Sequence, residues 1–332
     1  MMNSSDTKVS IICGFYNREN RLEESVESLI NQSHKNLEII LFDDCSTDNT
    51  LAKLKKYETD FRVKIIQHKE NIGFVSGLIN AIQVASGKYI AIHGSGDISE
   101  PNRIEEQVHI LNTKPAIGVV GCGVTNVKLD NENNTVYEHY RYKPCDGNQK
   151  YGILTQNFFT HGEVMFRKDK YDEVGGYRKE FKYAQDRDLW CRMSRVCDFY
   201  TINKPLYRRF YMSDGVGTVK NKLLIQRHLS EFACQCHEEV LAGGRDYLEE
   251  FGEKGFFFFK VNKRFAEGFE RICREKVKGN EIEDSKFFAS YIFSHYKGLV
   301  AIKCYVLYNV LNGKPLILKF KLKKSLKNLL GR

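Results

Sequence analysis

The chain has 332 residues, of which 42% are hydrophobic and 28% charged, so it can bury a full hydrophobic core. That length suits one large domain with an appendage or two modest domains, and the five prolines argue against a long disordered linker. The net charge of +9 is concentrated near the C-terminus, because the segment from Lys286 to Arg332 holds ten Lys and Arg residues and no Asp or Glu. The rest of the chain is close to neutral.

Cysteine usage and apolar runs indicate where the protein works. The ten cysteines include no two Cys-x-x-Cys pairs, so a structural zinc site has little support. Met1–Lys8 is polar and Val9–Phe15 is short, so we expect no secretory signal and a cytoplasmic protein with reduced thiols. The longest apolar candidate, Gly298–Leu311, is interrupted by Lys303 and Asn309, so we expect no membrane-spanning helix.

The first half of the chain alternates short apolar strands with amphipathic helices. Strands are predicted at Val9–Cys13, Leu37–Phe42, Val63–Ile66, Tyr89–Ile92 and Ile117–Val120. The alternation predicts an α/β fold with a mostly parallel sheet that helices cover on both faces. Ligands bind at the carboxyl ends of the strands in such sheets, so the acidic loops Asp43–Asp48 and His93–Asp97 are expected at one edge.

The second half of the chain changes character. The polar stretch Asn126–Tyr151 predicts a loop or an edge-strand insertion, and Asp186–Ser194 predicts a helix with Leu189 and Trp190 on one face. After Gly217 the pattern becomes long helices with aromatic clusters. The predicted domains are therefore residues 7–215 and a helical, basic extension at 216–332.

The acidic loops narrow the chemistry without deciding it. Carboxylates at strand ends can accept hydrogen bonds from a base or a ribose, or can hold a hard divalent cation, but such loops are more often solvated caps. The first strand is not followed by GxGxxG, which counts against dinucleotide binding, and a GxxxxGK[ST] loop for NTP hydrolysis is absent. A nucleotidyltransferase is disfavoured because no glycine- and arginine-rich phosphate loop follows that strand.

A series of motifs in the right order carries a family resemblance over about residues 8–215. The motifs are Val9–Asn17, Ser28–Gln32, Leu37–Thr50, Asn71–Gly73, Asn80, Ala85–Tyr89, Pro101-x-Arg103 with Gln107, Val164–Arg167, Gly175–Tyr177 and Gln185–Trp190. Together they resemble glycosyltransferase family 2. The resemblance implies a GT-A (Rossmann-like) fold and hexosyltransferase-like transfer, with inversion, from a nucleoside-diphosphate sugar to a saccharide or lipid-linked acceptor.

The resemblance also implies roles for single residues. Asp186 would be the general base, and Asp43 or Asp44 would meet the base or ribose of the nucleotide. The nucleotide-sugar site is predicted to comprise Tyr16, Asn17, Asp43, Asp44, Asn71, Asn80, Ser95, Asp97, Arg208 and Arg209. Uridine, thymidine and guanosine diphosphosugars all suit this scaffold, and the predicted setting is bacterial surface polysaccharide synthesis.

Asp186 has a physical case that does not depend on the family. An inverting displacement needs one carboxylate beside the acceptor hydroxyl, on the face opposite the departing diphosphate. A carboxylate at a helix start beside Lys182 and Arg187 keeps its charged form favoured. The other interpretation is that Asp186 only caps the helix that carries Trp190.

One motif departs from the family pattern. Where the family carries Asp-x-Asp, this chain has Gly94-Ser95-Gly96 and keeps only the following Asp97. Three interpretations follow: Asp97 with water and the phosphates holds Mg²⁺ or Mn²⁺, or backbone N–H groups with Arg208 and Arg209 replace the metal, or the protein is a catalytically degenerate nucleotide-sugar-binding or scaffold protein. His161 is a weak further metal candidate.

The basic tail allows two interpretations. In a helical register Leu318, Leu322 and Leu326 share one side of residues 314–332, with lysines around them. That pattern fits a helix lying on an anionic membrane surface, and equally a solvated helix packed on the domain. The first interpretation places the enzyme on the inner face of the membrane. Nucleic-acid binding is not expected, because no recognised module accompanies the basic run.

Overall fold

The apolar segments predicted as strands assemble into one sheet in the computed structural model, which describes residues 6–129, 135–211 and 219–312. The strands are β1 (Val9–Phe15), β2 (Leu37–Asp43), β3 (Val63–Gln67), β4 (Tyr89–Gly94), β5 (Ile98–Ser99), β6 (Ile117–Leu129), β7 (Thr135–Arg141), β8 (Asp146–Gly147), β9 (Met165–Arg167) and β10 (Asp198–Phe210). Every residue of β1 and β2 is buried, which explains why both segments are mostly apolar; the exceptions are Ser10, Glu38 and Asp43.

The strand order is β3-β2-β1-β4-β9-β6-β10-β5, with β7 paired to β6 and β8 to β10. β1 pairs in parallel with β2 and β4, and β2 pairs in parallel with β3. Beyond β4 the sheet is mixed, because β9 runs antiparallel to both β4 and β6 while β6 and β10 are parallel. The predicted α/β class is confirmed, and its parallel part is the half that carries both acidic loops.

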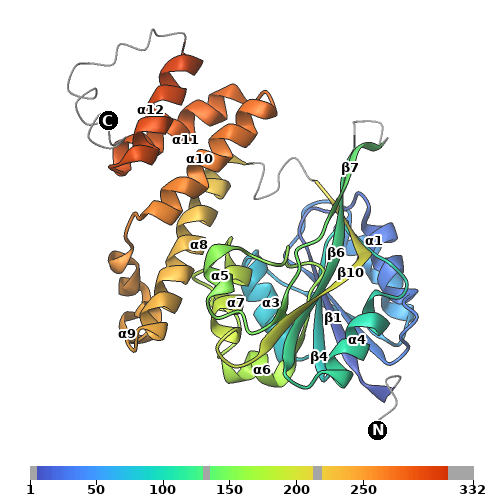
Figure 1. Cartoon of the computed structure of the whole chain (residues 1–332). Helices are drawn as coiled ribbons and strands as arrows, with labels where there is room; N and C mark the ends of the chain where they lie inside the picture. The colour runs from blue at the N-terminus through green and yellow to red at the C-terminus, as the bar shows by residue number, and fades with distance from the viewer. Residues whose placement is uncertain (1–5, 130–134, 212–218, 313–332) are drawn as a thin grey trace, which may run out of the picture. The chain divides into compact units, whose positions relative to one another are not determined.

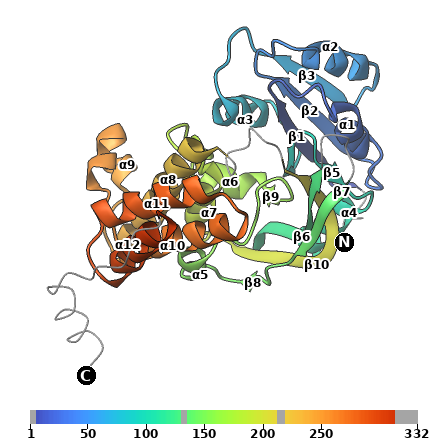
Figure 2. The same ribbon diagram turned by 90° about the horizontal axis from the view of Figure 1, so that it is seen from above.

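Helices cover both faces of this sheet. They are α1 (Leu22–Ile30), α2 (Thr50–Lys55), α3 (Phe74–Gln83), α4 (Arg103–Thr113), α5 (Gly152–Thr155), α6 (Lys168–Glu173) and α7 (Gln185–Met193), with a 3₁₀ helix at Lys56–Thr59. After the last strand the chain continues with α8 (Lys220–Leu241), α9 (Tyr247–Phe251) and a 3₁₀ helix at Gly252–Phe258. α1, α2 and α4 bury their apolar sides in one core, whereas α3 and α7 share the core on the other face. Figures 1 and 2 show α1 and α3 on opposite sides of the sheet.

The chain divides into two compact units, Met1–Lys254 and Gly255–Arg332. The predicted boundary after residue 215 lies earlier, and the difference comes from α8, which belongs to the first unit. Cys234 of α8 shares a buried core with Trp190 of α7, and the Gln226 side chain donates to the Tyr183 carbonyl at 2.9 Å. These contacts keep α8 with the sheet although its helical pattern resembles the helices that follow.

The second unit is helical, as predicted. It contains α10 (Lys263–Lys278), α11 (Ile282–His295) and α12 (Leu299–Leu311). The buried rings of Phe269 and Phe288 lie 5.5 Å apart, and the Ser285 hydroxyl donates to the Cys273 carbonyl at 2.9 Å. Among the described helices, none has the length and apolar character needed to span a bilayer. The predicted tail helix at 314–332 lies outside the described residues.

A buried ion network fixes α7. The Asp188 carboxylate, 1% exposed, accepts hydrogen bonds from the guanidinium groups of Arg178 and Arg192. Arg178 also reaches Asp246, which caps the N-terminus of α9. Burial alone would raise the pKa of Asp188, but the charges of Arg192 and Arg178 outweigh burial and hold its pKa below the ordinary value. The network therefore ties α7, α9 and the segment before α7 together.

We expect Asp188→Ala to lower the free energy of unfolding by about 3–5 kcal/mol, because it leaves the buried guanidinium of Arg192 without its counter-ion and Arg178 with Asp246 alone. Urea unfolding at pH 7, with the exposed Asp169→Ala as control, measures this cost. Since the folded pKa of Asp188 is lowered, its contribution is present above the unfolded pKa near 3.9 and is lost as pH falls through the folded pKa. An equal cost for both variants would contradict the role of the network.

Candidate active site

The loops that follow β1, β2 and β4 leave the sheet at one edge. In the parallel register Phe15 lies opposite Asp43, and Gly14 lies opposite Gly94. The two acidic loops therefore share an edge, as the alternation of strands and helices predicted. Tyr16, which is 46% exposed, lies at the same edge directly after β1.

Asn17 fastens the loop after β1 to the loop after β2. Its backbone N–H donates to the Ser46 hydroxyl at 2.9 Å, and its side-chain oxygen accepts from the Thr47 N–H at 2.8 Å. Asn17 has a φ of 50°, a left-handed conformation that asparagine tolerates better than most residues. Asn17, which was predicted as part of the nucleotide-sugar site, thus holds the shape of this edge.

Asp43 and Asp44 have different surroundings, although both are buried. Asp44 uses both oxygens within the protein: Oδ1 accepts from the Ile72 N–H and lies 3.0 Å from His68, and Oδ2 accepts from the Gly73 N–H. Asp43 accepts the Ser46 N–H through Oδ2, and its Oδ1 has no partner among the described residues. A buried acceptor without a partner is costly, so Asp43 is the better candidate to meet a ligand.

The two predicted asparagines are separated by α3. Asn71 lies in the turn before this helix and lines a pocket, whereas Asn80 is exposed in the second half of the helix. At 1.5 Å of rise per residue, Asn80 lies about 9 Å along the helix from its first residue. Asn80 is outside the set of residues that line the pocket, so the structure does not bring it to the site.

Asp97 joins the loop after β4 to β10. Its Oδ2 accepts from the Tyr207 hydroxyl at 2.7 Å, and its Oδ1 accepts from the Phe210 N–H at 2.9 Å. Burial raises the pKa of Asp97 to about 7, although these hydrogen bonds and the charge of Arg209 oppose the rise. Both oxygens therefore serve the protein itself. Ser95, at the tip of this loop, is half-buried.

The residues around Asp97 do not fit a divalent cation held by the protein. Mg²⁺ and Mn²⁺ are bound by ionised oxygen ligands, whereas Asp97 is buried and engaged through both oxygens. No group of three His, Cys, Asp or Glu side chains suited to a metal occurs among the described residues, and His161 belongs to no such group. Gly94 reinforces this arrangement, because a Cβ there would lie 2.4 Å from Oδ2 of Asp97.

Arg208 and Arg209 follow each other on β10, so their side chains leave opposite faces of the strand. Arg208 reaches Glu138 at 3.4 Å, and its guanidinium carbon lies 5.9 Å from the centre of the Phe210 ring. Arg209 donates to the Tyr211 hydroxyl at 3.2 Å and acts electrostatically on Asp97. The structure thus places both predicted arginines beside the loop after β4.

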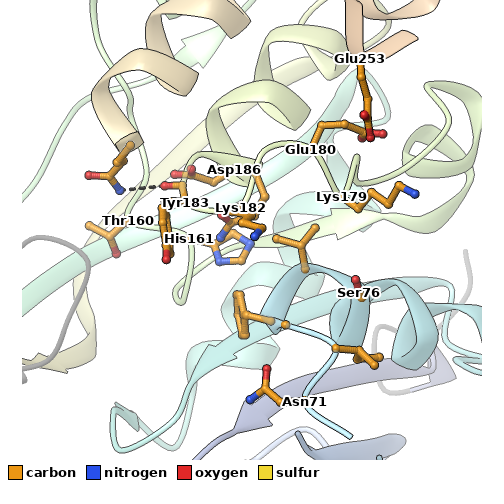
Figure 3. Close-up of a pocket in the computed structure, with 16 residues that line it drawn as sticks. Asn71, Ser76, Thr160, His161, Lys179, Glu180, Lys182, Tyr183, Asp186 and Glu253 are labelled. Carbon is orange, nitrogen blue, oxygen red and sulfur yellow. Dashed lines mark hydrogen bonds between the residues drawn. The ribbon is translucent and has the colours of Figure 1, made fainter. Parts of the chain in front are cut away.

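A pocket of about 730 Å³ opens between the turn before α3 and the segment that leads into α7. Its lining comprises Asn71, Ile72, Gly73, Phe74, Val75, Ser76, Thr160, His161, Lys179, Glu180, Lys182, Tyr183, Gln185, Asp186, Gln226 and Glu253. Figure 3 shows Asp186, His161 and Lys182 close together on one wall, with Asn71 and Ser76 on the other. The volume is sufficient for a small ligand such as a sugar.

Asp186 lies in the first turn of α7 and lines this pocket. Its Oδ2 accepts a hydrogen bond from the Asn157 amide at 2.8 Å, while its Oδ1 has no hydrogen-bond partner among the described residues. Asp186 accepts none of the backbone N–H groups that a helix cap would bind. The capping interpretation is therefore not supported, and one carboxylate oxygen remains for a ligand.

His161 shares the pocket with Asp186 and is 8% exposed. Its Nε2 lies 2.7 Å from the Tyr177 hydroxyl, and its φ of 88° is unusual for a residue with a side chain. Burial lowers the pKa of His161, against the opposing charge of Asp186, so the ring is neutral near pH 7. Strained backbone of this kind concentrates at functional sites.

Two residues of the site were not predicted. Asn157, which holds Asp186, is 29 positions away in sequence and falls in a stretch without a motif. Arg21 donates to the Gly96 carbonyl at 3.3 Å across the edge of the sheet at which β1, β2 and β4 end, called the strand-end edge below. Its position directly before α1 in the sequence gave no indication of this contact. Both contacts arise only when separate loops meet.

We expect Gly94→Ala to lower the free energy of unfolding by about 1–3 kcal/mol, because the new Cβ overlaps the carboxylate of Asp97. The cost should be smaller when Asp97→Ala is already present, so a double-mutant cycle read by urea unfolding checks the prediction. Gly268→Ala is the control without overlap, since a Cβ there meets no atom within 4 Å; in the interior of α10 it should raise stability by up to about 1 kcal/mol. The same cost in both backgrounds would show that Asp97 is not the obstacle.

Comparisons with known sequences agree with these observations. The model of glycosyl transferase family 2 matches residues 10–175. The putative glycosyltransferase EpsE of Bacillus subtilis is 36% identical over 62% of this chain and 73% of its own length. An uncharacterized glycosyltransferase of Haemophilus influenzae is 31% identical over 57% of this chain, and the match spans 60% of that protein. Chondroitin synthase of Escherichia coli is 31% identical over 66% of this chain and only 31% of its own length.

Solved structures match the fold over nearly the whole chain. TarS of S. aureus (residues 1–349), crystallised in complex with UDP-GlcNAc, superposes with a TM-score of 0.59 at 17% identity, covering 92% of each chain. The same TarS fragment in complex with UDP gives a TM-score of 0.54 at 16% identity, covering 88% of this chain and 93% of TarS. These structures confirm the predicted GT-A fold. The matched family model, the related sequences and the ordered motifs together show that this chain belongs to glycosyl transferase family 2.

Proposed function

We propose that this protein transfers a sugar from a nucleoside-diphosphate sugar to a hydroxyl group of a saccharide or lipid-linked acceptor, with inversion at the anomeric carbon. The observation that carries the proposal is the carboxylate of Asp186, which lines the pocket with one oxygen held by Asn157 and the other without a partner among the described residues. A general base must lie within hydrogen-bonding distance of the proton that it removes, and its pKa affects the rate only when this geometry is met.

The donor is proposed to bind across the strand-end edge. Asp43 supports this placement, because its buried Oδ1 has no partner among the described residues and can accept a hydrogen bond from a base or ribose. Tyr16 and Asn71 are proposed to flank the nucleotide from the loops after β1 and before α3. TarS, which has the same fold, was crystallised with UDP and with UDP-GlcNAc, which favours a nucleoside-diphosphate sugar of the hexosyl type.

In the proposed reaction the acceptor hydroxyl lies against Asp186. Its oxygen attacks the anomeric carbon as the carbon–oxygen bond to the diphosphate breaks, and Asp186 takes the proton. The nucleoside diphosphate then leaves with the bonding electrons. His161, neutral and beside Asp186, adds no positive charge that would lower the proton affinity of the carboxylate. A divalent ion on the diphosphate stays a prediction from the sequence.

The proposed pathway rests on the names of related proteins. Its relatives include a protein named chondroitin synthase, of which the matched part is 31%. We therefore propose a role in the synthesis of a bacterial polysaccharide, without assigning an acceptor. The alternative, a non-catalytic protein that binds nucleotide sugars, is favoured by one observation, the replacement of two family carboxylates by Gly94 and Gly96.

Asp186→Asn should reduce turnover of the donor by about 100-fold or more, because the amide cannot accept the proton of the acceptor. The measurement is release of UDP, dTDP or GDP from matching sugar donors, with water or a bacterial saccharide extract as acceptor. With an α-linked donor, NMR of the first sugar released into water should show the β-anomer.

Glu173→Gln, an exposed change on α6, is the control for Asp186→Asn and should retain wild-type turnover. Retention of full turnover in Asp186→Asn would remove Asp186 from the mechanism. Tight binding of a donor with no turnover on any acceptor would favour the non-catalytic alternative.

We also propose that the tail, residues 314–332, holds the enzyme at an anionic membrane surface on the cytoplasmic side. The support is the sequence pattern of leucines flanked by lysines, which lies outside the described residues. Deletion of the residues after Gly313 should abolish flotation with vesicles that contain phosphatidylglycerol, while neutral phosphatidylcholine vesicles should bind neither form. Unchanged flotation of the shortened chain would exclude this role of the tail.

A further inference from the structure

Three segments meet beside the loop after β4. Arg21, in the segment between β1 and α1, donates from Nε to the Gly96 carbonyl at 3.3 Å. Its guanidinium carbon lies 3.6 Å from the centre of the Phe210 ring at the end of β10. A Cβ added to Gly96 would have the Cβ of Arg21 as its nearest neighbour, at 3.9 Å. Arg21 therefore stands on the side to which a residue-96 side chain would point.

A second arginine, Arg208, lies near the same Phe210 ring as Arg21. Arg208 lies on the same side of β10 as Phe210, and its buried Nε has no partner among the described residues. The carboxylates that face these two arginines are Glu24, 2.8 Å from Arg21, and Glu138, 3.4 Å from Arg208. Both carboxylates are at least half exposed, so water screens them and they neutralise the arginines only weakly.

The chemistry of the missing group explains what these arginines can do. A divalent ion on a diphosphate supplies positive charge that offsets the charge developing on the leaving group. Where the family has carboxylates to hold that ion, this chain has Gly94 and Gly96, and Asp97 is engaged by β10. A guanidinium group supplies the same sign of charge and binds phosphate oxygens through two parallel N–H groups.

We infer that Arg21, assisted by Arg208, takes the place of the divalent ion at the donor's diphosphate, so that this chain binds nucleoside diphosphates without a metal. The inference rests on the proposed function, because it assumes that the diphosphate lies beside the loop after β4. It differs from the sequence-based alternative in its residues: Arg21 was not a candidate there, and Arg209 leaves the opposite face of β10.

The test is calorimetric binding of UDP, dTDP, GDP and inorganic pyrophosphate to the full chain, in EDTA and in Mn²⁺. We expect at least one nucleotide to bind in EDTA with an affinity within about threefold of that in Mn²⁺. Arg21→Gln should weaken this binding about 10- to 100-fold, because it removes the charge and the paired donors. Arg21→Lys keeps the positive charge but loses the two parallel N–H donors, so its affinity should lie between those of the wild type and Arg21→Gln.

Two further variants complete the design. Arg208→Ala should weaken binding in the same buffer, and it tests the site without touching the start of α1. Arg245→Ala removes one positive charge from an exposed position of the same unit and should leave the affinity unchanged. Circular dichroism spectra and melting curves establish that each variant is folded before its affinity is compared.

The outcomes separate the inference from the proposed function. Nucleotide binding that requires Mn²⁺, or that is unaffected by Arg21→Gln and Arg208→Ala, overturns the inference and leaves the proposed function standing. Absence of binding of every nucleotide in both buffers overturns the two together. Binding in EDTA that both arginine variants weaken, with Arg245→Ala unchanged, supports the inference.

Discussion

The strand-end edge depends on one buried carboxylate. Asp97 accepts the Tyr207 hydroxyl and the Phe210 N–H, and so holds the loop after β4 against β10, more than a hundred residues later in the chain. The same Tyr207 hydroxyl accepts the N–H of Gly94, which closes the loop from its other end. Because this carboxylate fills the space of a side chain at position 94, the glycine and the aspartate are one structural unit. Asp97, which the family resemblance associates with metal binding, instead holds two segments of this protein together through its hydrogen bonds.

The carboxylates of this edge show how similar residues divide their work. Asp44 uses both oxygens to hold the turn before α3, whereas Asp43, one residue earlier, keeps an oxygen without a described partner. Asp186 is likewise held through one oxygen only, and the buried Asp188 two residues later secures the helix that carries it. Carboxylates with both oxygens engaged stabilise the fold, and those with one oxygen left over are the candidates for chemistry.

Much of the candidate site could be predicted from the sequence. The residues that could not be predicted were missed for one shared reason. The positions of Tyr16, Asp43 and Asp97 at strand ends follow from short apolar segments, which are local features. Asn80 carried an equally good motif, yet α3 takes it away from the edge along a rigid helix. Asn157 and Arg21 lie outside every recognised motif. Each acts through a contact between two loops that are far apart in sequence, and sequence separation does not reveal that the loops meet in space.

The sequence by itself determined the alternation of strands and helices, the family and the loss of two carboxylates at Gly94 and Gly96, since these depend only on residue type and order. Only the tertiary structure decided the antiparallel insertion of β9 between β4 and β6, the attachment of α8 to the first unit, and the engagement of both Asp97 oxygens within the protein. Those features arise from pairings between distant segments, where packing and hydrogen bonding in three dimensions override local pattern. The electrostatics of the site belong to this second group, because an aspartate's role depends on which donors reach its two oxygens.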